Sequence, residues 1–472
     1  MRSKKMLKRI SAALCMVVFV SIQLCGITAE AFNFEPVKGY DEDGNTIPLS
    51  LYSESVYMFN MDTGDVIIDV NSNEQRVPAS LTKIMTAIVL LDEFDGDENK
   101  LKSTKYSAGT EAFDELYGTG ASTADIQPNE EVTCYDLLCA LMLPSACEAA
   151  NIIAIGVSGS LDKFADRMNE KAEEIGMADS HFSNAHGLSG DNNYTTCADV
   201  AKMCVYALDN YQVFTDVVSM YDYTLAPTTE HPDGTYIYNT NQMLASDSLY
   251  YYSYCRGIKT GTLDVAGRCL ASYAVNDGER YMIVSMGAPM EKTAEDVTKG
   301  EENPSSVYAA DTVYYNLIDH INLYEWAFNY LAETEFVDKN SELREVKVEF
   351  GEDKRDYVTI KPAEGYTKFW PSYIPKDEVK QSIEVYDNVV APVYAGDELG
   401  MLTLTYKGET IAEIPLIATE SVNRSQAAAK KAVAKAFPHS TEFKIAIAVI
   451  VIFTAGSTAI YIMNVQKKYR KK

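Results

Sequence analysis

The sequence is poor in positive charge, with 41 Lys and Arg residues against 68 Asp and Glu residues and a net charge of −27. The few positive charges gather at the two ends. Residues 1–31 carry +4 and residues 444–472 carry +6, which leaves −37 on the segment between them. A strongly acidic body repels polyanions, so we expect neither nucleic acid nor another anionic polymer as a partner.

The sequence also lacks the cysteine spacing of a metal or redox site. Nine cysteines are present, and no two of them form a C-x-x-C pair. His181 and His186 lie close together but have no convincing third ligand nearby. We therefore expect no metal and no cofactor. Outside the N-terminal apolar run we expect mostly free thiols at seven positions, namely Cys134, Cys139, Cys147, Cys197, Cys204, Cys255 and Cys269.

Two long apolar runs stand at the ends of the chain. The run Ile10–Ile27 follows five basic residues and precedes Ala29-Glu30-Ala31, a pattern that predicts a signal peptide over residues 1–31, cleaved before Phe32. The stretch from Ile445 to Met463 is long enough to cross a bilayer and is followed by a basic tail, residues 464–472. We expect a single transmembrane helix over 445–463, with the tail in the cytoplasm and the body outside the cell.

The chain between these runs is long enough for two domains. Residues 32–50 are polar and predict a surface lead-in, and residues 51–335 mix helical and strand patterns. Short strand patterns over residues 340–420 predict a small all-β domain. The Ala/Lys-rich segment 421–444 predicts an amphipathic stalk helix that leads into the membrane span.

A hydroxyl and an amine meet in the stretch Pro78–Thr86. The segment after Ser80 is apolar and free of Gly and Pro, so Ser80 and Lys83 should lie on one face of a helix near its N-terminus. A serine becomes a nucleophile when a neighbour takes its proton. A lysine can do this only if desolvation or nearby positive charge, including the helix dipole, keeps its amine neutral. The pair alone is a weak signal, because both residues are common.

Two further segments are equally weak alone. Pro144 interrupts a helical region and leaves Ser145 on a turn, where its hydroxyl can face a cleft or cap the helix that follows; the turn by itself favours capping. Lys259-Thr260-Gly261 lies on or beside a β-strand, where an ordinary strand-end lysine is the simpler interpretation.

Together, the Ser80-x-x-Lys83 pair, Ser145 and Lys259-Thr260-Gly261 stand in the order that resembles the low-molecular-weight penicillin-binding proteins, specifically the serine D-alanyl-D-alanine carboxypeptidases. Asn184–Leu188 and Asn239–Asn241 also look like segments of that family. The resemblance covers most of the chain. It implies an α/β class fold, with a penicillin-binding and β-lactamase-like transpeptidase domain, a small all-β domain and a C-terminal membrane helix.

The resemblance also implies a reaction. Ser80 would attack the carbonyl between two D-alanines of a peptidoglycan stem peptide, expel the last D-alanine and leave an acyl-enzyme that water hydrolyses. Lys83 would be the general base, and Ser145 would relay the proton to the leaving amine. β-Lactams, which mimic the dipeptide, would acylate Ser80.

The implied substrate-binding residues lie in two segments. Lys259 and Thr260 would hold the terminal carboxylate, Gly261 belongs to the same segment, and the N–H groups of Ser80 and Thr262 would form the oxyanion hole. Cys147 stands where the family usually has Asn. A thiol is a weaker hydrogen-bonding group than a carboxamide, so the rate and the balance between hydrolysis and transpeptidation are open.

Three alternatives remain beside the carboxypeptidase. A DD-transpeptidase would use the same fold and residues. A β-lactamase fits poorly, because no Glu-x-x-Leu-Asn run follows Ser145. A catalytically weak wall-binding or sensor protein would keep the cleft, with Cys147 as the sign of decay. Labelling by a fluorescent penicillin that is lost in Ser80→Ala distinguishes a competent nucleophile from this last class.

Overall fold

The computed structural model describes residues 34–41, 43–188, 192–303, 305–352, 355–427, 430 and 441–469. The predicted signal peptide, residues 1–31, lies outside the described residues, as does much of the predicted stalk helix. The chain forms two compact units. The first unit contains Ala31–Glu333 together with Phe369–Ile374, and the second contains Thr334–Lys368 and Pro375–Lys472.

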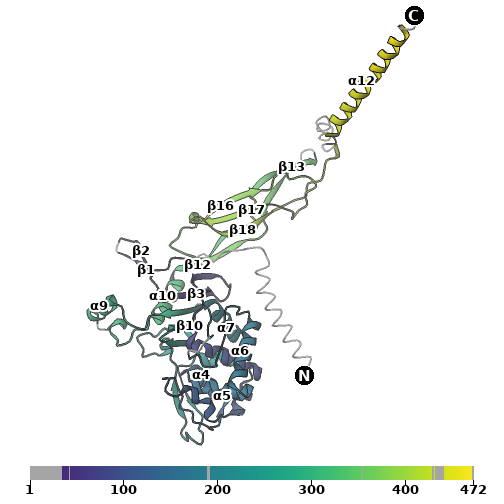
Figure 1. Ribbon diagram of the computed structural model, residues 1–472. Helices are drawn as coiled ribbons and strands as arrows, with labels where there is room; N and C mark the ends of the chain where they lie inside the picture. Colours follow the sequence, from purple (N-terminus) through teal and green to yellow (C-terminus); the bar gives the residue numbers. More distant parts are fainter. Residues whose placement is uncertain are drawn as a thin grey trace. The chain divides into compact units, whose positions relative to one another are not determined.

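The first unit is built on a five-stranded antiparallel sheet with the strand order β4-β3-β11-β10-β9 (Figure 1). The first two strands, β4 and β3, form an antiparallel hairpin, and β9, which carries the Lys-Thr-Gly segment, is an edge strand. An edge strand leaves backbone groups of one side free for another chain. The strands are β3 (Ser55–Asn60), β4 (Val66–Val70), β9 (Cys255–Leu263), β10 (Gly267–Asn276) and β11 (Glu279–Ala288).

Successive residues of a strand face opposite sides of the sheet, and helices pack on both sides. Ala271 and Val284 belong to the buried core shared with α2 and α7. Ser272 and Ser285 face the other way and bond the ring of His320 on α10, at 2.7 and 2.9 Å. The helices are α2 (Thr82–Glu93), α3 (Glu98–Ser103), α4 (Cys134–Met142), α5 (Cys147–Ser158), α6 (Leu161–Ile175), α7 (Cys197–Asn210), α8 (Gln212–Val218), α9 (Ala294–Glu302) and α10 (Tyr315–Tyr330).

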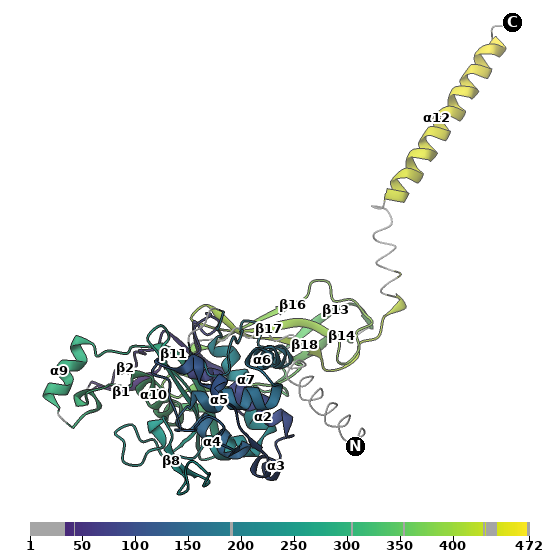
Figure 2. The same ribbon diagram turned by 60° about the horizontal axis from the view of Figure 1, so that its bottom comes forward.

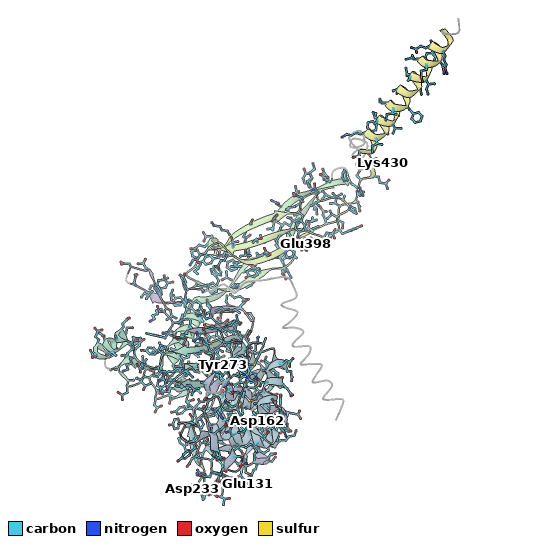
Figure 3. All side chains as sticks on the ribbon, in the orientation of Figure 1. Glu131, Asp162, Asp233, Tyr273, Glu398 and Lys430 are labelled. Atoms are coloured by element: carbon cyan, nitrogen blue, oxygen red, sulfur yellow. The ribbon has the colours of Figure 1, made fainter. Side chains whose placement is uncertain are left out.

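Side-chain caps fix where several of these helices begin. Thr133, Ser160 and Thr196 each accept a backbone N–H from the first turn of α4, α6 and α7, which satisfies a donor that the helix cannot pair. Asp162, in the first turn of α6, lies among the helices, whereas Tyr273 lies in the sheet (Figure 3). The helix α2 packs against α4, α5, α6 and α7, so the segment after Ser80 is the centre of the helical layer.

Three short antiparallel pairs complete the first unit. The first lies inside the predicted lead-in 32–50, which is therefore partly structured, with Phe34 and Leu49 buried. The hairpin of β7 and β8 lies beside α4 (Figure 2). The pairs are β1 (Val37–Tyr40) with β2 (Thr46–Pro48), β5 (Lys105–Tyr106) with β6 (Val132–Thr133), and β7 (Asp222–Leu225) with β8 (Thr235–Tyr238).

The second unit contains a five-stranded antiparallel sheet with the order β13-β14-β18-β17-β16. Buried and half-buried residues alternate along β17 from Gly400 to Tyr406, as expected of a sheet with one face more covered than the other. Two further strands, β12 (Leu331–Val337) and β15 (Tyr366–Pro371), pair with each other. The five strands are β13 (Arg344–Glu352), β14 (Arg355–Pro362), β16 (Lys380–Val385), β17 (Glu398–Tyr406) and β18 (Glu409–Ala418).

The last helix, α12 (Thr441–Tyr469), contains the predicted membrane span. Its segment Phe443–Lys467, 25 residues, is long and apolar enough to cross a bilayer. The predicted stalk helix does not begin at residue 421. Val422 exchanges backbone hydrogen bonds with Val393, at 2.8 and 3.0 Å, so the chain there is extended and belongs to the β unit.

Candidate active site

The predicted nucleophile and base are brought together. Ser80 lies on the 3₁₀ turn η1 (Ala79–Leu81), and Lys83 is the second residue of α2. The amine Nζ of Lys83 lies 3.1 Å from Ser80 Oγ. The prediction that both residues share one α-helix is therefore wrong in detail: Ser80 precedes α2 on the tighter turn, and the contact is still made because η1 runs directly into the helix.

Burial sets the charge of the two lysines. Lys83 has no exposed surface, and burial lowers the pKa of its amine, although Cys147 and Glu148 act in the opposite direction. Lys259 is also buried, and its pKa lies well below the ordinary value because of burial and repulsion by Lys83. Its Nζ donates to the carbonyl of Thr260, at 3.1 Å. Because burial favours the neutral form of Lys83, its amine can accept a proton from Ser80.

The edge strand β9 passes close to Ser80 because Gly261 has no side chain. A Cβ at this position would lie 3.2 Å from the backbone N of Ser80 and 3.1 Å from the carbonyl oxygen of Pro78. Thr262 follows on the same strand and is exposed. On the other side of the glycine, Thr260 Oγ1 lies 2.5 Å from Thr240 Oγ1. The predicted residues of this strand thus line the approach to Ser80.

Ser145 does not cap the helix that follows it. Its backbone is left-handed, with φ of +69°, and the N-cap of α5 is Ala146, which makes no side-chain cap. The hydroxyl of Ser145 is buried and has no hydrogen-bond partner among the residues that the structure describes. The interpretation as a cap is wrong. A buried hydroxyl without a partner is unusual, and a ligand would satisfy it.

Cys147 contacts the same lysine. Its Sγ lies 3.4 Å from Lys83 Nζ, and its backbone N–H donates to the carbonyl of Ser122, at 2.8 Å. All seven cysteines of the described chain are free and buried, which confirms the prediction of free thiols. The thiol of Cys147, a predicted substrate-binding residue, therefore lies beside the predicted base.

The sequence did not reveal the role of His186, which was considered only as a possible metal ligand and as part of the segment Asn184–Leu188. The carbonyl of His186 accepts from Lys83 Nζ at 2.5 Å. Its ring Nδ1 accepts the N–H of Leu188, and Nε2 lies 3.0 Å from the carboxylate of Glu115, so the hydrogen-bond pattern assigns a neutral ring that donates through Nε2. Burial lowers the pKa of His186. The family-like segment Asn184–Leu188 was the signal that could have found it.

His181 takes no part in this arrangement, because its Nδ1 pairs with the carbonyl of Asn192. Among the described residues no group of three or more His, Cys, Asp or Glu side chains is placed to hold a metal ion.

Comparison with known proteins agrees with the site. A family model described as D-alanyl-D-alanine carboxypeptidase matches residues 43–290, and one described as the penicillin-binding protein 5 C-terminal domain matches residues 332–424. The chain belongs to the D-alanyl-D-alanine carboxypeptidase family. This confirms the predicted family, and the two matches agree with the predicted succession of a mixed α/β domain and a β-rich domain.

Individual members of the family are similar over most of their length. The carboxypeptidase DacF of Bacillus subtilis is 28% identical over 83% of this chain and 92% of its own. The carboxypeptidase DacD of Escherichia coli K12 is 23% identical over 86% of this chain and 93% of its own. The D-alanyl-D-alanine carboxypeptidase of Streptomyces sp. K15 is 31% identical over 47% of this chain and 76% of its own.

Solved structures share the fold. The carboxypeptidase DacD of Francisella tularensis superposes with a TM-score of 0.61 at 23% identity, covering 80% of this chain and 95% of that one. A mutant of the Streptomyces K15 DD-transpeptidase has a TM-score of 0.50 at 26% identity and covers 59% of this chain and 99% of its own. These likenesses confirm the predicted fold class.

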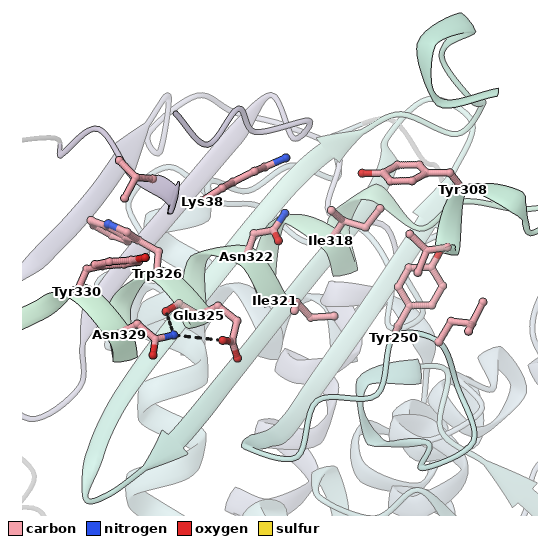
Figure 4. A pocket seen from close by; sticks show the side chains of 13 residues that line it. Lys38, Tyr250, Tyr308, Ile318, Ile321, Asn322, Glu325, Trp326, Asn329 and Tyr330 are labelled. Carbon is pink, nitrogen blue, oxygen red and sulfur yellow. Dashed lines mark hydrogen bonds between the residues drawn. The ribbon is translucent and has the colours of Figure 1, made fainter. Parts of the chain in front are cut away.

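The first unit also contains a groove of about 510 Å³ over α10 (Figure 4). Tyr308, Ile321 and Asn322 are among its lining residues, and Asn329 donates to Glu325 at its edge. None of the predicted catalytic or substrate-binding residues lines it. The groove is therefore separate from the site around Ser80.

Proposed function

We propose that this protein removes the terminal D-alanine from peptidoglycan stem peptides through an acyl-enzyme on Ser80. The observation that carries the proposal is the 3.1 Å contact between Ser80 Oγ and the fully buried amine of Lys83. A family that acts on D-alanyl-D-alanine needs a strong nucleophile at neutral pH, and this contact supports Ser80 in that role.

Lys83 accepts the proton of Ser80 as Oγ attacks the carbonyl of the scissile peptide. The C–N bond then breaks. Ser145 passes a proton to the leaving amine, which departs as D-alanine, and water later hydrolyses the ester on Ser80. The buried, unpartnered hydroxyl of Ser145 supports this relay role, because it has no competing acceptor among the described residues.

Binding of the substrate falls to β9 and the turn before α2. The N–H groups of Ser80 and Thr262 stabilise the oxyanion, and Gly261 permits their close approach. Lys259 and Thr260 hold the terminal carboxylate, and Cys147 contacts the donor peptide near Lys83. β-Lactams carry a carboxylate and a strained amide in the same relation, so they acylate Ser80 and inhibit.

The test is D-alanine release from a diacyl-L-Lys-D-Ala-D-Ala peptide by the full chain in detergent, with Ser80→Ala as the matched variant. Release by the wild type that vanishes in Ser80→Ala supports the proposal. Absence of both release and covalent labelling by a fluorescent penicillin in the wild type would overturn it. Labelling without release would show a competent nucleophile and would favour transpeptidation.

Transpeptidation by the same acyl-enzyme is the second candidate. It is favoured by Cys147, which replaces the usual Asn, and by the likeness to the Streptomyces K15 DD-transpeptidase. An added amine that appears in the product of the wild type, but not of Ser80→Ala, would demonstrate it.

The apolar helix near the C-terminus supports a location for this reaction at the membrane. We infer that Phe443–Lys467 crosses the membrane once, with the acidic body outside the cell and the basic tail in the cytoplasm. An epitope after Lys472 should resist protease added to intact protoplasts and become sensitive after permeabilisation. Sensitivity before permeabilisation would reverse the orientation.

A further inference from the structure

The hairpin of β7 and β8 presents two exposed tyrosines on one face. Tyr236 and Tyr238 are 63% and 59% exposed and alternate along β8, so their rings stand on the same side. Tyr238 lies opposite Asp222 on β7, and the hydroxyl of Tyr236 donates to the Asp222 carboxylate at 2.9 Å. We call Asp222, Tyr236 and Tyr238 the hairpin face.

This face carries a negative charge. The hydrogen bond to Asp222 raises the pKa of Tyr236, and the negative charge of Asp247 raises it further. Asp247 therefore lies close to the hairpin face. Neither aspartate forms an ion pair with a lysine or arginine within the described part of the chain. Aromatic faces beside unpaired carboxylates are a combination that attracts ammonium groups.

Contacts on the opposite side of the hairpin hold it in place. The hydroxyl of Tyr223 donates to Asp136 on α4 at 3.0 Å, and the Tyr223 ring meets the edge of Tyr135 at 5.9 Å. Near the tip, His231 Nδ1 lies 2.9 Å from the Glu130 carboxylate. The outer tyrosines are therefore displayed by a fixed scaffold and not by a free loop.

A short stretch of chain connects the hairpin face to the candidate active site. Two residues after Tyr238, Thr240 donates its N–H to the carbonyl of Leu143 at 3.0 Å and contacts Thr260 through the 2.5 Å pair of hydroxyls. Two residues span at most about 7 Å of chain. Tyr238 therefore stands about one side-chain length from a residue that touches the Lys-Thr-Gly segment.

The position of the face relative to the reaction follows from the proposed function. Lys259 and Thr260 hold the carboxylate of the departing D-alanine, so the hairpin lies beyond the leaving-group end, where the donor peptide stops. When an amine instead of water resolves the acyl-enzyme, it must occupy the place that the leaving amine vacated, by microscopic reversibility. The rest of such an acceptor extends toward the hairpin.

We propose that the hairpin face binds the ammonium-bearing chain of a second peptide and so directs it as an acyl acceptor. The neutral amine at the reacting end attacks the ester carbonyl on Ser80. A new C–N bond forms, the bond from carbon to Oγ breaks, and the proton lost by the amine returns to Oγ. The inference rests on the proposed acyl-enzyme, and it adds a specificity site that hydrolysis does not use.

Two acceptor amines that differ by one charge test the proposed acceptor site. D-Lysinamide and D-norleucine amide offer similar α-amines and side chains of similar length, but only the first carries an ε-ammonium group. The full chain in detergent is given diacyl-L-Lys-D-Ala-D-Ala with either amine, and the ratio of transferred to hydrolysed product is measured. We expect a ratio about three- to fivefold higher for D-lysinamide, the size of an exposed cation–π contact.

Variants of the face should lose this preference. In Asp222→Asn and in the double variant Tyr236→Ser with Tyr238→Ser, the two amines should give the same ratio, whereas Tyr394→Ser, which changes a tyrosine of the other unit that is 60% exposed, should keep the wild-type preference. Because the ratio compares two products of one acyl-enzyme, a change in its rate of formation does not affect it. Penicillin labelling confirms that each variant is folded.

The possible results separate the two proposals. Equal ratios in the wild type, a preference that survives in the face variants, or hydrolysis without any transfer would each overturn the acceptor site and leave the carboxypeptidase standing. A wild type that neither releases D-alanine nor binds penicillin covalently would overturn the proposed function itself.

Discussion

The amine of Lys83 lies 3.4 Å from the sulfur of Cys147, which contacts the proposed base together with Ser80 Oγ and the carbonyl of His186. A thiol accepts and donates hydrogen bonds weakly, so it orients the amine poorly. The same thiol neighbours the carbonyl of Ser145, at 3.9 Å, and so belongs to the segment that carries the proposed relay.

We predict that Cys147→Asn accelerates D-alanine release about fivefold. The carboxamide would accept from Lys83 and donate to the substrate, and one such hydrogen bond is worth about 1 kcal/mol. Steady-state release from the diacyl tripeptide measures the effect. Cys139→Ala, a buried cysteine of α4 outside the site, is the control and should leave the rate unchanged. An unchanged or slower Cys147→Asn would show that the thiol is not a handicap.

The charge of Lys83 should govern the pH dependence of acylation. Burial lowers its pKa below 10.5, so the neutral base forms at a lower pH than for a free lysine. We expect the acylation rate by a fluorescent penicillin to rise with pH and to level off below pH 10.5. A rate that still rises at that pH would contradict a depressed pKa.

Lys83→Arg removes the base and keeps the positive charge. Guanidinium stays protonated at all accessible pH values, so we predict a loss of acylation of about 10³-fold, within the range of general base catalysis. The pH dependence described above should disappear in the residual rate. A variant with acylation within tenfold of the wild type would assign the base to another group, of which the nearby Lys259 is the first to test.

The sequence allowed most of the site to be predicted, because the chemistry of Ser80, Lys83 and Lys259 is local to short segments. Two features were not predictable. The contact of His186 with Lys83 joins α2 to a loop about a hundred residues away, and no local pattern sets such a distance. The left-handed backbone of Ser145 is imposed by the junction of α4 and α5, whereas turn statistics alone favour a cap.

The fold was predicted best where the pattern is strongly periodic. The hairpin of β3 and β4 and the helix α6 follow from their own residues. The strands β10 and β11 extend beyond their apolar cores, because pairing with each other carries polar residues such as Asn276 and Glu279 into the sheet. Tertiary pairing, and not propensity, sets those ends.

Gly261→Ala should slow acylation by about ten- to a hundredfold. The new methyl group would lie 3.2 Å from the backbone N of Ser80, a backbone atom that cannot move away cheaply, so β9 would shift and displace an oxyanion donor. Penicillin acylation measures the loss. Gly109→Ala is the control, since its Cβ meets only the flexible carboxylate of Glu111. Equal rates for both variants would show that the close approach is not needed.

The last prediction concerns a carboxyl group that stabilises the first unit from α10. Asp319 is fully buried and accepts from the backbone N–H and hydroxyl of Ser53, at 2.8 and 2.7 Å, and from the N–H of Tyr52, at 3.0 Å. These bonds favour the ionised form, but burial outweighs them and raises the pKa of Asp319 to about 6. The folded protein therefore binds this proton more tightly than the unfolded chain, whose aspartates titrate near pH 4.

The contribution of Asp319 to stability is accordingly largest below pH 4 and is lost as the pH rises through about 6. Over that window the free energy of unfolding of the wild type should fall, relative to Asp319→Asn, by about 3 kcal/mol. The chain has two tryptophans: Trp326 lies on α10, and Trp370 lies in the part of β15 that belongs to the first unit, so their fluorescence during urea unfolding follows that unit. A difference between the two proteins that is constant from pH 4 to 7, or that grows with pH, would mean that Asp319 is ionised throughout and that its three hydrogen bonds outweigh its burial.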